Sequence, residues 1–154
     1  MASLGPATVL DAGCGTGRVA IELARRGIET VGVDIDPEML STARRKAPEL
    51  TWIEDDLATV RLDRRFDVAV MAGNVMIFLT PGTEGAVIAN VAEHLVTGGA
   101  LVAGFQLISG RLDLETYDRL AGEAGLDLHD RWATWEGAPW GPGGDYAVSV
   151  HRRR

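Results

Sequence analysis

The sequence predicts an α/β fold built on a doubly wound, mostly parallel sheet. Three observations lead to this prediction. Short apolar segments rich in β-branched residues alternate along the chain with segments of helical spacing. The helical segments between consecutive strands are long enough for crossovers, which implies parallel pairing. The last two apolar segments flank a loop rich in glycine and proline, which is typical of a hairpin. We therefore expect a Rossmann-like sheet of seven strands, mostly parallel, with an antiparallel C-terminal strand.

Each expected element has a local signal. Strands are indicated by β-branched apolar runs, and helices by apolar residues three and four positions apart. Gly27 supplies a C-terminal stop for the first helix, and Pro37 suits the first turn of the second. The expected strands cover residues 8–11, 30–34, 50–54, 66–71, 100–106, 126–135 and 146–150. The expected helices cover residues 19–26, 37–47, 84–96 and 114–125.

The composition fits a single domain over residues 1–154. Of these residues 46% are hydrophobic and 24% are charged, and a chain of this length forms a core without disulfides or a metal. The single cysteine, Cys14, excludes an internal disulfide. No apolar run approaches the roughly 18–20 residues of a membrane helix. We therefore expect a cytoplasmic protein that has no membrane partner and no metal site.

The charge argues against nucleic acid as a partner. The 22 acidic residues outnumber the 15 basic ones, and the net charge of −7 repels a phosphate backbone. The one dense basic cluster is residues 151–154. We interpret this cluster as a solvated terminus, with a binding patch as the alternative.

Doubly wound sheets bind ligands beyond the carboxyl ends of their strands, so the residues that follow each strand are the candidates. The first strand runs into the turn DAGCGTGR at residues 11–18, which opens a helix. Its glycines allow a ligand to approach the backbone, and the N–H groups at the helix start offer hydrogen bonds. The spacing G-x-G-x-G differs from the dinucleotide pattern G-x-G-x-x-G. Asp34 ends the second strand, where a carboxylate can accept both hydroxyls of a ribose.

The runs VLDAGCGTG at residues 9–17 and GVDIDPEML at residues 32–40 resemble the first two motifs of class I S-adenosylmethionine-dependent methyltransferases. Later landmarks agree with this resemblance. The pair Asp56-Leu57 resembles the family's adenine-reading acid and its neighbour. Residues 66–70 resemble its fourth strand, and residues 94–101 resemble the helix, turn and strand that follow. The resemblance covers about residues 7–107 in order.

The resemblance implies S-adenosylmethionine as the cofactor and S-adenosylhomocysteine as the product. It implies that the glycine turn lets the methionine part approach the chain and that Asp11 orients its ammonium group. Backbone carbonyls after the fourth strand would complete this end. Cys14 would contribute its backbone and act as a small filler, not as a nucleophile. The residues implied at this end are Asp11, Gly13, Cys14, Gly15, Gly17, Met71 and Ala72.

At the adenosine end, the resemblance implies that Asp34 holds the ribose diol. Ile35 and Met39 would pack on the adenine faces, with a purely structural role in the core as the alternative. Asp56 would accept a hydrogen bond from the exocyclic amine, and the Leu57 N–H would reach a ring nitrogen.

No catalytic residue is assigned. The cofactor brings an electrophilic methyl group, so the protein mainly aligns a nucleophile and excludes water. A general base is needed only if the acceptor is a hydroxyl or a protonated amine. The predicted topology places His94, His129 and His151 away from the carboxyl ends of the strands.

The substrate rim is expected in the loops after strands four, five and six. The candidates for substrate binding are Asn74, Met76, Gln106, Arg111, Trp135 and Trp140. The two tryptophans have two interpretations. Either they pack the hairpin over the sheet edge, or they form an aromatic wall for an apolar or planar acceptor.

The chain differs from the family pattern before the first strand, which begins at about residue 7. Family members usually carry helices there that cover the site, so we expect a domain that lacks the usual N-terminal cap helices. Three alternatives follow: the chain is truncated, a partner chain or a homo-oligomer covers the site, or a large acceptor covers it.

The expected function is S-adenosylmethionine-dependent methyl transfer to a small-molecule acceptor. One alternative is a non-catalytic S-adenosylmethionine-binding module that regulates a partner or depends on one. Another is a nicotinamide-dependent oxidoreductase, which the G-x-G-x-G spacing and Asp56 disfavour.

Overall fold

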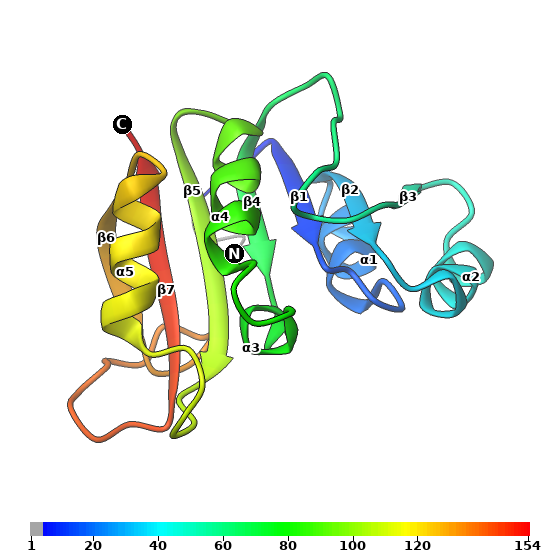
Figure 1. The fold of residues 1–154 in the computed structure, drawn as a ribbon. Coiled ribbons are helices and arrows are strands. Elements are labelled where there is room, and N and C mark those ends of the chain that lie inside the picture. Colours follow the sequence, from blue (N-terminus) through cyan, green and yellow to red (C-terminus); the bar gives the residue numbers. More distant parts are fainter. Residues whose placement is uncertain (1–4) are drawn as a thin grey trace.

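A computed structural model describes residues 5–154 and shows one seven-stranded sheet (Figure 1). The strand order is β3-β2-β1-β4-β5-β7-β6. Strands β1 to β5 pair in parallel, whereas β7 pairs antiparallel with both β5 and β6. The strands are β1 Thr8–Ala12, β2 Glu29–Asp34, β3 Thr51–Glu54, β4 Phe66–Met71, β5 Leu95–Gln106, β6 Leu126–Trp132 and β7 Tyr146–Arg153. The predicted fold class is confirmed.

Helices cover both faces of the sheet, as the doubly wound arrangement requires. Apolar residues of α4 and α5 share a buried cluster with one face, and those of α1 pack on the other face. The helices are α1 Arg18–Arg25, α2 Pro37–Lys46, α3 Val75–Phe78, α4 Glu84–Glu93 and α5 Leu114–Glu123. The single turn α3 was not predicted, because four residues are too few to show a helical period.

The boundaries around β5 differ from the prediction. Helix α4 ends at Glu93, and Leu95 already pairs with Phe66, after which the register with β4 shifts. The sequence predicted a helix to residue 96 and a strand from residue 100. A helical apolar pattern continues through residues 95 and 96, so periodicity alone extends the helix too far.

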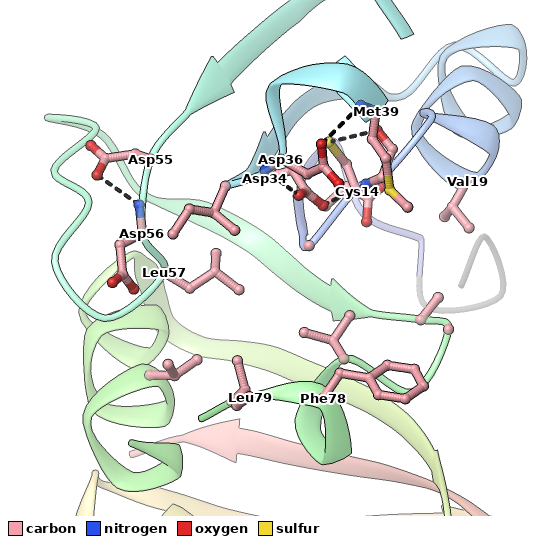
Figure 2. Close-up of a pocket in the computed structure, with 18 of the residues that line it drawn as sticks. Cys14, Val19, Asp34, Asp36, Met39, Asp55, Asp56, Leu57, Phe78 and Leu79 are labelled. Carbon is pink, nitrogen blue, oxygen red and sulfur yellow. Dashed lines mark hydrogen bonds between the residues drawn. The ribbon is translucent and has the colours of Figure 1, made fainter. Parts of the chain in front are cut away.

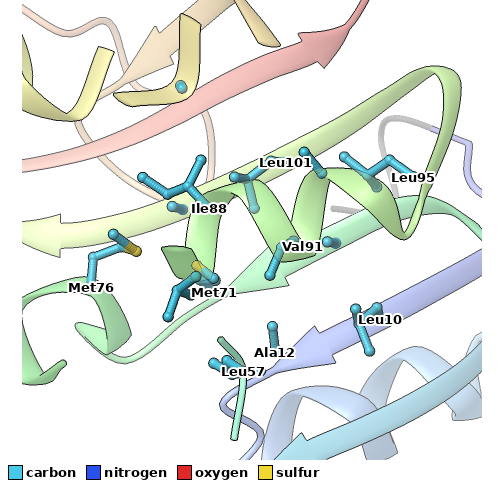
Figure 3. Close-up of a cluster of buried hydrophobic side chains, with 14 of the residues drawn as sticks. Leu10, Ala12, Leu57, Met71, Met76, Ile88, Val91, Leu95 and Leu101 are labelled. Atoms are coloured by element: carbon cyan, nitrogen blue, oxygen red, sulfur yellow. The ribbon is translucent and has the colours of Figure 1, made fainter. Parts of the chain in front are cut away.

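The strands that carry the candidate site are buried on both faces. Between the sheet and α4, the side chains of Leu10, Met71, Ile88 and Leu101 form part of the main apolar cluster (Figure 3). Val9 and Val70, which point to the opposite face, are fully buried too. Because β1 and β4 are fixed from both sides, the loops at their carboxyl ends start from rigid positions.

The C-terminal arginines are bound within the domain, so the interpretation as a solvated terminus is wrong. Arg153 Nη1 donates to the carbonyls of Ala92 at 2.9 Å and Leu95 at 2.6 Å, at the end of α4. Arg154 donates to the Gly122 carbonyl near the end of α5. Helix ends leave carbonyls without intrahelical partners, and these guanidinium groups satisfy some of them. His151, before them, is buried beneath α5.

Among residues 5–154, no helix has the length and apolarity needed to span a membrane.

Candidate cofactor-binding site

One cavity of about 640 Å³ opens at the carboxyl ends of β1 to β4, where the sequence placed the ligand (Figure 2). It runs from the glycine turn after β1, past the end of β2, to the segment after β3. Its opposite wall comes from the segment after β4. A cavity of this size accommodates a ligand of several hundred daltons.

The glycine turn is attached to β2 by three backbone donors. The N–H groups of Gly13 and Cys14 both donate to the Val33 carbonyl, at 2.8 and 3.0 Å. The Gly15 N–H donates to Asp34 Oδ2 at 2.7 Å. Gly13 has a φ of 83°, and a Cβ built on it would lie 2.7 Å from Val75 Cγ2 of α3. The turn is therefore held between β2 and α3, with its backbone facing the cavity.

Asp34 lies at the centre of this arrangement. Its Oδ2 accepts from Gly15, and its Oδ1 accepts from the Asp36 N–H at 2.9 Å. A carboxylate has about four acceptor positions, so each oxygen retains capacity for a hydroxyl of a ligand. Asp34 lines the cavity, in the place from which it could bind a ribose diol.

Asp11 is a buried carboxyl whose charge is not compensated. The residue is 2% exposed, and its buried Oδ2 has no hydrogen-bond partner among the described residues. The pKa of Asp11 is raised to about 7, mainly by burial and also by the nearby Asp34 carboxylate, while a hydrogen bond from the Ala20 N–H opposes the rise. Asp11 lines the cavity. A buried carboxyl oxygen without a partner is costly, so it fits a site for a cationic or hydrogen-bond-donating ligand group.

Two large apolar side chains lie exposed in the cavity. Ile35 is 66% exposed and Met39 is 44% exposed, and both belong to the cavity lining. The alternative that they are core residues is therefore excluded by their exposure. Asp36 caps α2 by accepting from the N–H groups of Glu38 and Met39, which agrees with a helix-cap role.

At the far end of the cavity, Asp56 Oδ1 accepts from the Ala58 N–H at 2.8 Å and closes a turn. Leu57 lines the cavity, and its N–H has no hydrogen-bond partner among residues 5–154. The Asp56 carboxylate can accept from the exocyclic amine of an adenine, and the adjacent Leu57 N–H can donate to a ring nitrogen.

The structure thus brings together ten of the twelve predicted cofactor residues, and it places Gly17 and Met71 outside the lining. Gly17 starts α1, and a Cβ on it would lie 2.6 Å from the Trp52 ring. Its role is therefore close packing between α1 and Trp52. Met71 is fully buried in the core, whereas its neighbour Ala72 reaches the cavity.

Cys14 packs against apolar neighbours, with its side chain in a cluster that includes Leu40 and Trp52. Burial raises the pKa of the Cys14 thiol, and the carboxylates of Asp11 and Asp34 raise it further. The thiol therefore stays protonated, which agrees with the filler role that the sequence predicted.

The predicted substrate residues after β4 and β5 have structural partners. Asn74 Oδ1 accepts from the Gln106 N–H at 2.8 Å, and Arg111 Nη1 donates to the Ile77 carbonyl at 3.1 Å. Met76 is buried in the main core, so its side chain does not face the rim where the sequence placed it.

The two predicted tryptophans are part of the β6–β7 hairpin packing. Trp135 covers Gly104 of β5, where a Cβ would lie 2.6 Å from its ring, and its Nε1 donates to the Tyr146 hydroxyl at 2.9 Å. The Trp140 ring lies over the Arg131 guanidinium, 5.9 Å from the ring centre. Neither tryptophan lines the cavity.

None of the three histidines lines the cavity. His94 ends α4 and is bonded to the Asn90 carbonyl and the Leu62 N–H. His151 Nε2 lies 3.0 Å from Asp118 Oδ1, and burial lowers the pKa of His151.

Val75 and Phe78 line the cavity, and both lie in residues 73–78, the loop after strand four where the sequence predicts part of the substrate rim. Lining residues that the sequence did not predict include Arg18, Val19 and Leu79. The signal that could have found Leu79 is the Gly73-Asn74 pair after β4, which turns the chain back toward the first strand.

Comparison with known proteins agrees with this site. Residues 9–99 match the family model described as a methyltransferase domain. A TehB-like SAM-dependent methyltransferase from Corynebacterium glutamicum has a solved structure that is similar over 96% of this chain and 80% of that one, with 33% identity and a TM-score of 0.89.

Curated relatives match over shorter segments. An N,N-dimethyltransferase of a dTDP-linked amino sugar from Streptomyces venezuelae is 34% identical over 96 residues, which cover 62% of this chain and 40% of the relative. A magnesium-protoporphyrin O-methyltransferase from Rhodobacter capsulatus is 36% identical over 78 residues, covering 47% of this chain and 34% of the relative. The matches thus span less than half the length of these relatives.

S-adenosylmethionine is the cofactor of this family. The residues present fit it: an uncompensated carboxyl, a second carboxylate with free acceptor capacity, exposed apolar side chains and a glycine turn in contact with α3. Together with the family match over residues 9–99, this geometry shows that the chain belongs to the class I S-adenosylmethionine-dependent methyltransferases.

Proposed function

We propose that this chain binds S-adenosylmethionine in the cavity and transfers its methyl group to a small-molecule acceptor. The observation that carries the proposal is the buried Asp11 carboxyl with its partnerless Oδ2, in the same cavity as Asp34 and the exposed Ile35. An anionic site of this kind attracts a ligand that carries both an ammonium and a sulfonium.

Each residue has a role in this proposal. Asp11 would bind the ammonium group, and the glycine turn would contact the methionine part, with Ala72 on the opposite side. Asp34 would bind the ribose hydroxyls. Ile35, Met39, Asp56 and Leu57 would hold the adenine. When bound, the cofactor supplies an electrophilic methyl carbon, so the chain's own task is to orient the acceptor and exclude water.

A small molecule as acceptor is supported by the names of two relatives, which give an amino sugar and a porphyrin as their substrates. Among residues 5–154, the cavity lining contains no histidine, lysine or tyrosine, so its candidates for a general base are aspartates. The proposal assigns Asp11, Asp34 and Asp56 to the cofactor, so an acceptor that needs no general base, such as a neutral amine or a thiolate, fits this arrangement. The same observation favours a second candidate, a non-catalytic S-adenosylmethionine-binding module.

Two measurements test the proposal. Isothermal titration calorimetry with S-adenosylmethionine, S-adenosylhomocysteine and NAD should show binding of the first two only. Binding of NAD alone would contradict it. Methyl transfer from labelled S-adenosylmethionine to a panel of amines and thiols would then separate an enzyme from a binding module.

A further inference from the structure

Helix α3 is a single turn that forms a wall of the cavity, and three contacts fix its position. Val75 touches the glycine turn, since a Cβ on Gly13 would lie 2.7 Å from Val75 Cγ2. Met76 and Ile77 are buried in the main core. One isolated turn has little stability of its own, so these contacts decide where it lies.

The first residue before the helix is strained. Asn74 has a φ of 65°, in the left-handed region, which residues with a Cβ rarely adopt. The hydrogen bond from the Gln106 N–H to Asn74 Oδ1, at 2.8 Å, ties this strained residue to the end of β5. The start of α3 is therefore set by β5 as well as by β4.

A second tie reaches the end of α3 from the segment after β5. The Arg111 N–H donates to the Ile108 carbonyl at 3.0 Å and closes a turn, and Arg111 Nη1 donates to the Ile77 carbonyl at 3.1 Å. Ile77 precedes Phe78, so the position of Phe78 depends on this guanidinium.

Phe78 is the one side chain of α3 that is exposed. It is 73% exposed although Met76 and Ile77 beside it are buried, and it lines the cavity. Figure 2 shows Phe78 and Leu79 on the wall opposite Cys14 and Met39. Exposed single apolar residues are common, but α3, which carries this one, is held at the cavity by one hydrogen bond from the end of β5 and one from the segment after it.

The charge of the cavity restricts what can lie against Phe78. The lining contains the carboxylates of Asp34, Asp36, Asp55 and Asp56, together with Asp11, and Arg18 as its basic residue. An anionic acceptor is repelled by this surface, whereas a neutral or cationic one is not.

We propose that Phe78 is a specificity-determining residue that contacts a flat apolar group of a neutral or cationic methyl acceptor. Asn74 and Arg111 are positioning residues that hold Phe78 there through α3. The proposal rests on the proposed function, because it assigns the acceptor side of the same cavity. An aromatic ring stacked on Phe78 gains a favourable ring–ring contact in addition to the burial of its apolar area.

The test uses a probe that has these properties, 1-naphthylmethylamine, with protein saturated by S-adenosylhomocysteine. The probe should bind the parent protein and bind Phe78→Ala about tenfold more weakly. Phe78→Trp should retain binding. Leu128→Ala is the matched control, because Leu128 is 49% exposed on β6 and does not line the cavity. S-adenosylhomocysteine affinity and melting temperature should be unchanged in all of them.

The roles of Asn74 and Arg111 are tested by comparing probe binding with S-adenosylhomocysteine binding in their variants. Arg111→Met and Asn74→Gly should weaken probe binding while the S-adenosylhomocysteine affinity stays within about twofold of the parent. Arg111→Lys should bind the probe more tightly than Arg111→Met, because lysine keeps a donor for the Ile77 carbonyl. Glycine retains the left-handed backbone at position 74 and removes only the side-chain tie.

The outcomes separate the two proposals. Failure of S-adenosylhomocysteine to bind the parent protein would remove the proposed function, and the acceptor assignment with it. Normal S-adenosylhomocysteine binding would overturn the Phe78 assignment alone if the probe did not bind, or if Phe78→Ala bound it as tightly as the parent. A parallel loss of probe binding, S-adenosylhomocysteine binding and stability in Arg111→Met would overturn the positioning role.

Discussion

Asp34 Oδ2 accepts the Gly15 N–H at 2.7 Å, so one carboxylate both shapes the glycine turn and borders the ligand cavity. The turn after β1 and the end of β2 therefore respond together to a change at Asp34. Substitutions at Asp34 and at the buried Asp11 should therefore change both the cofactor affinity and the stability of the protein.

Asp34→Ala should weaken S-adenosylmethionine binding by about 10- to 100-fold, because a hydrogen bond to a charged group contributes roughly 1.5–3 kcal/mol. The protein should remain folded, with a lower melting temperature from the loss of the bonds to Gly15 and Asp36. Calorimetry and thermal unfolding check both expectations. Asp55→Ala is the control, since it removes an exposed carboxylate of the same cavity that accepts only from the adjacent Asp56 N–H. Equal affinity of Asp34→Ala and the parent would contradict the ribose assignment.

Asp11→Asn should stabilise the ligand-free protein at high pH. The folded pKa of about 7 lies above the unfolded value near 3.8, so the parent loses stability as the pH rises from about 4 to about 7. An amide does not ionise and avoids this loss. The stability difference between variant and parent should shift in favour of the variant by about 2–3 kcal/mol between pH 5 and pH 8. Urea unfolding at the two pH values measures it.

The same substitution should weaken S-adenosylmethionine binding by about tenfold or more at pH 8, because the ionised carboxylate is the form that binds an ammonium. The affinity of the parent should rise between pH 6 and pH 8, and that of Asp11→Asn should not. A stabilised variant with full affinity would show that Asp11 does not contact the cofactor.

Trp135→Ala should destabilise the protein by about 2–3 kcal/mol, since the ring fills the space over Gly104 and is bonded to Tyr146. Trp140→Ala should cost about 1–2 kcal/mol, the scale of a half-buried cation–π contact with Arg131. Denaturant midpoints compare the two. An altered acceptor affinity with unchanged melting in Trp140→Ala would favour the aromatic wall over hairpin packing.

Arg153→Met should lower stability by about 1.5–3 kcal/mol, because it removes a charged donor from carbonyls at the end of α4. Arg25→Met removes an exposed pair with Glu22 at 3.7 Å and should change stability by less than about 0.5 kcal/mol. Similar small effects of both substitutions on the denaturant midpoint would rule out a capping role for Arg153.

The parts of the site that the sequence predicted are those with local motifs. The glycine turn, Asp34 and the Asp56-Leu57 pair each follow a strand directly, and the topology of a parallel sheet brings strand ends together. The resemblance to the family then supplied their roles. Gly17 lies outside the cavity lining and packs against Trp52, and a glycine needed for such packing has the same sequence signature as one needed by a ligand.

The parts that could not be predicted depend on contacts between distant segments. The tie from Arg111 to Ile77 joins residues 34 positions apart, and the Asn74 side chain accepts from a residue 32 positions away. Both were therefore interpreted as substrate contacts. The capping of α4 by Arg153 spans about 60 positions and looks like a solvated charge cluster from sequence alone.

Strand β7 lies between β5 and β6, which leaves β6 at the edge of the sheet, away from the strands that carry the cavity. Strand β6 pairs only with β7, whereas the cavity lies at the carboxyl ends of β1 to β4 and no residue of β6 or β7 lines it. Local opening of the β6–β7 edge can therefore occur while the cavity stays intact. In hydrogen exchange, amides around the cavity should slow when a ligand binds, and those of β6 should keep their rates.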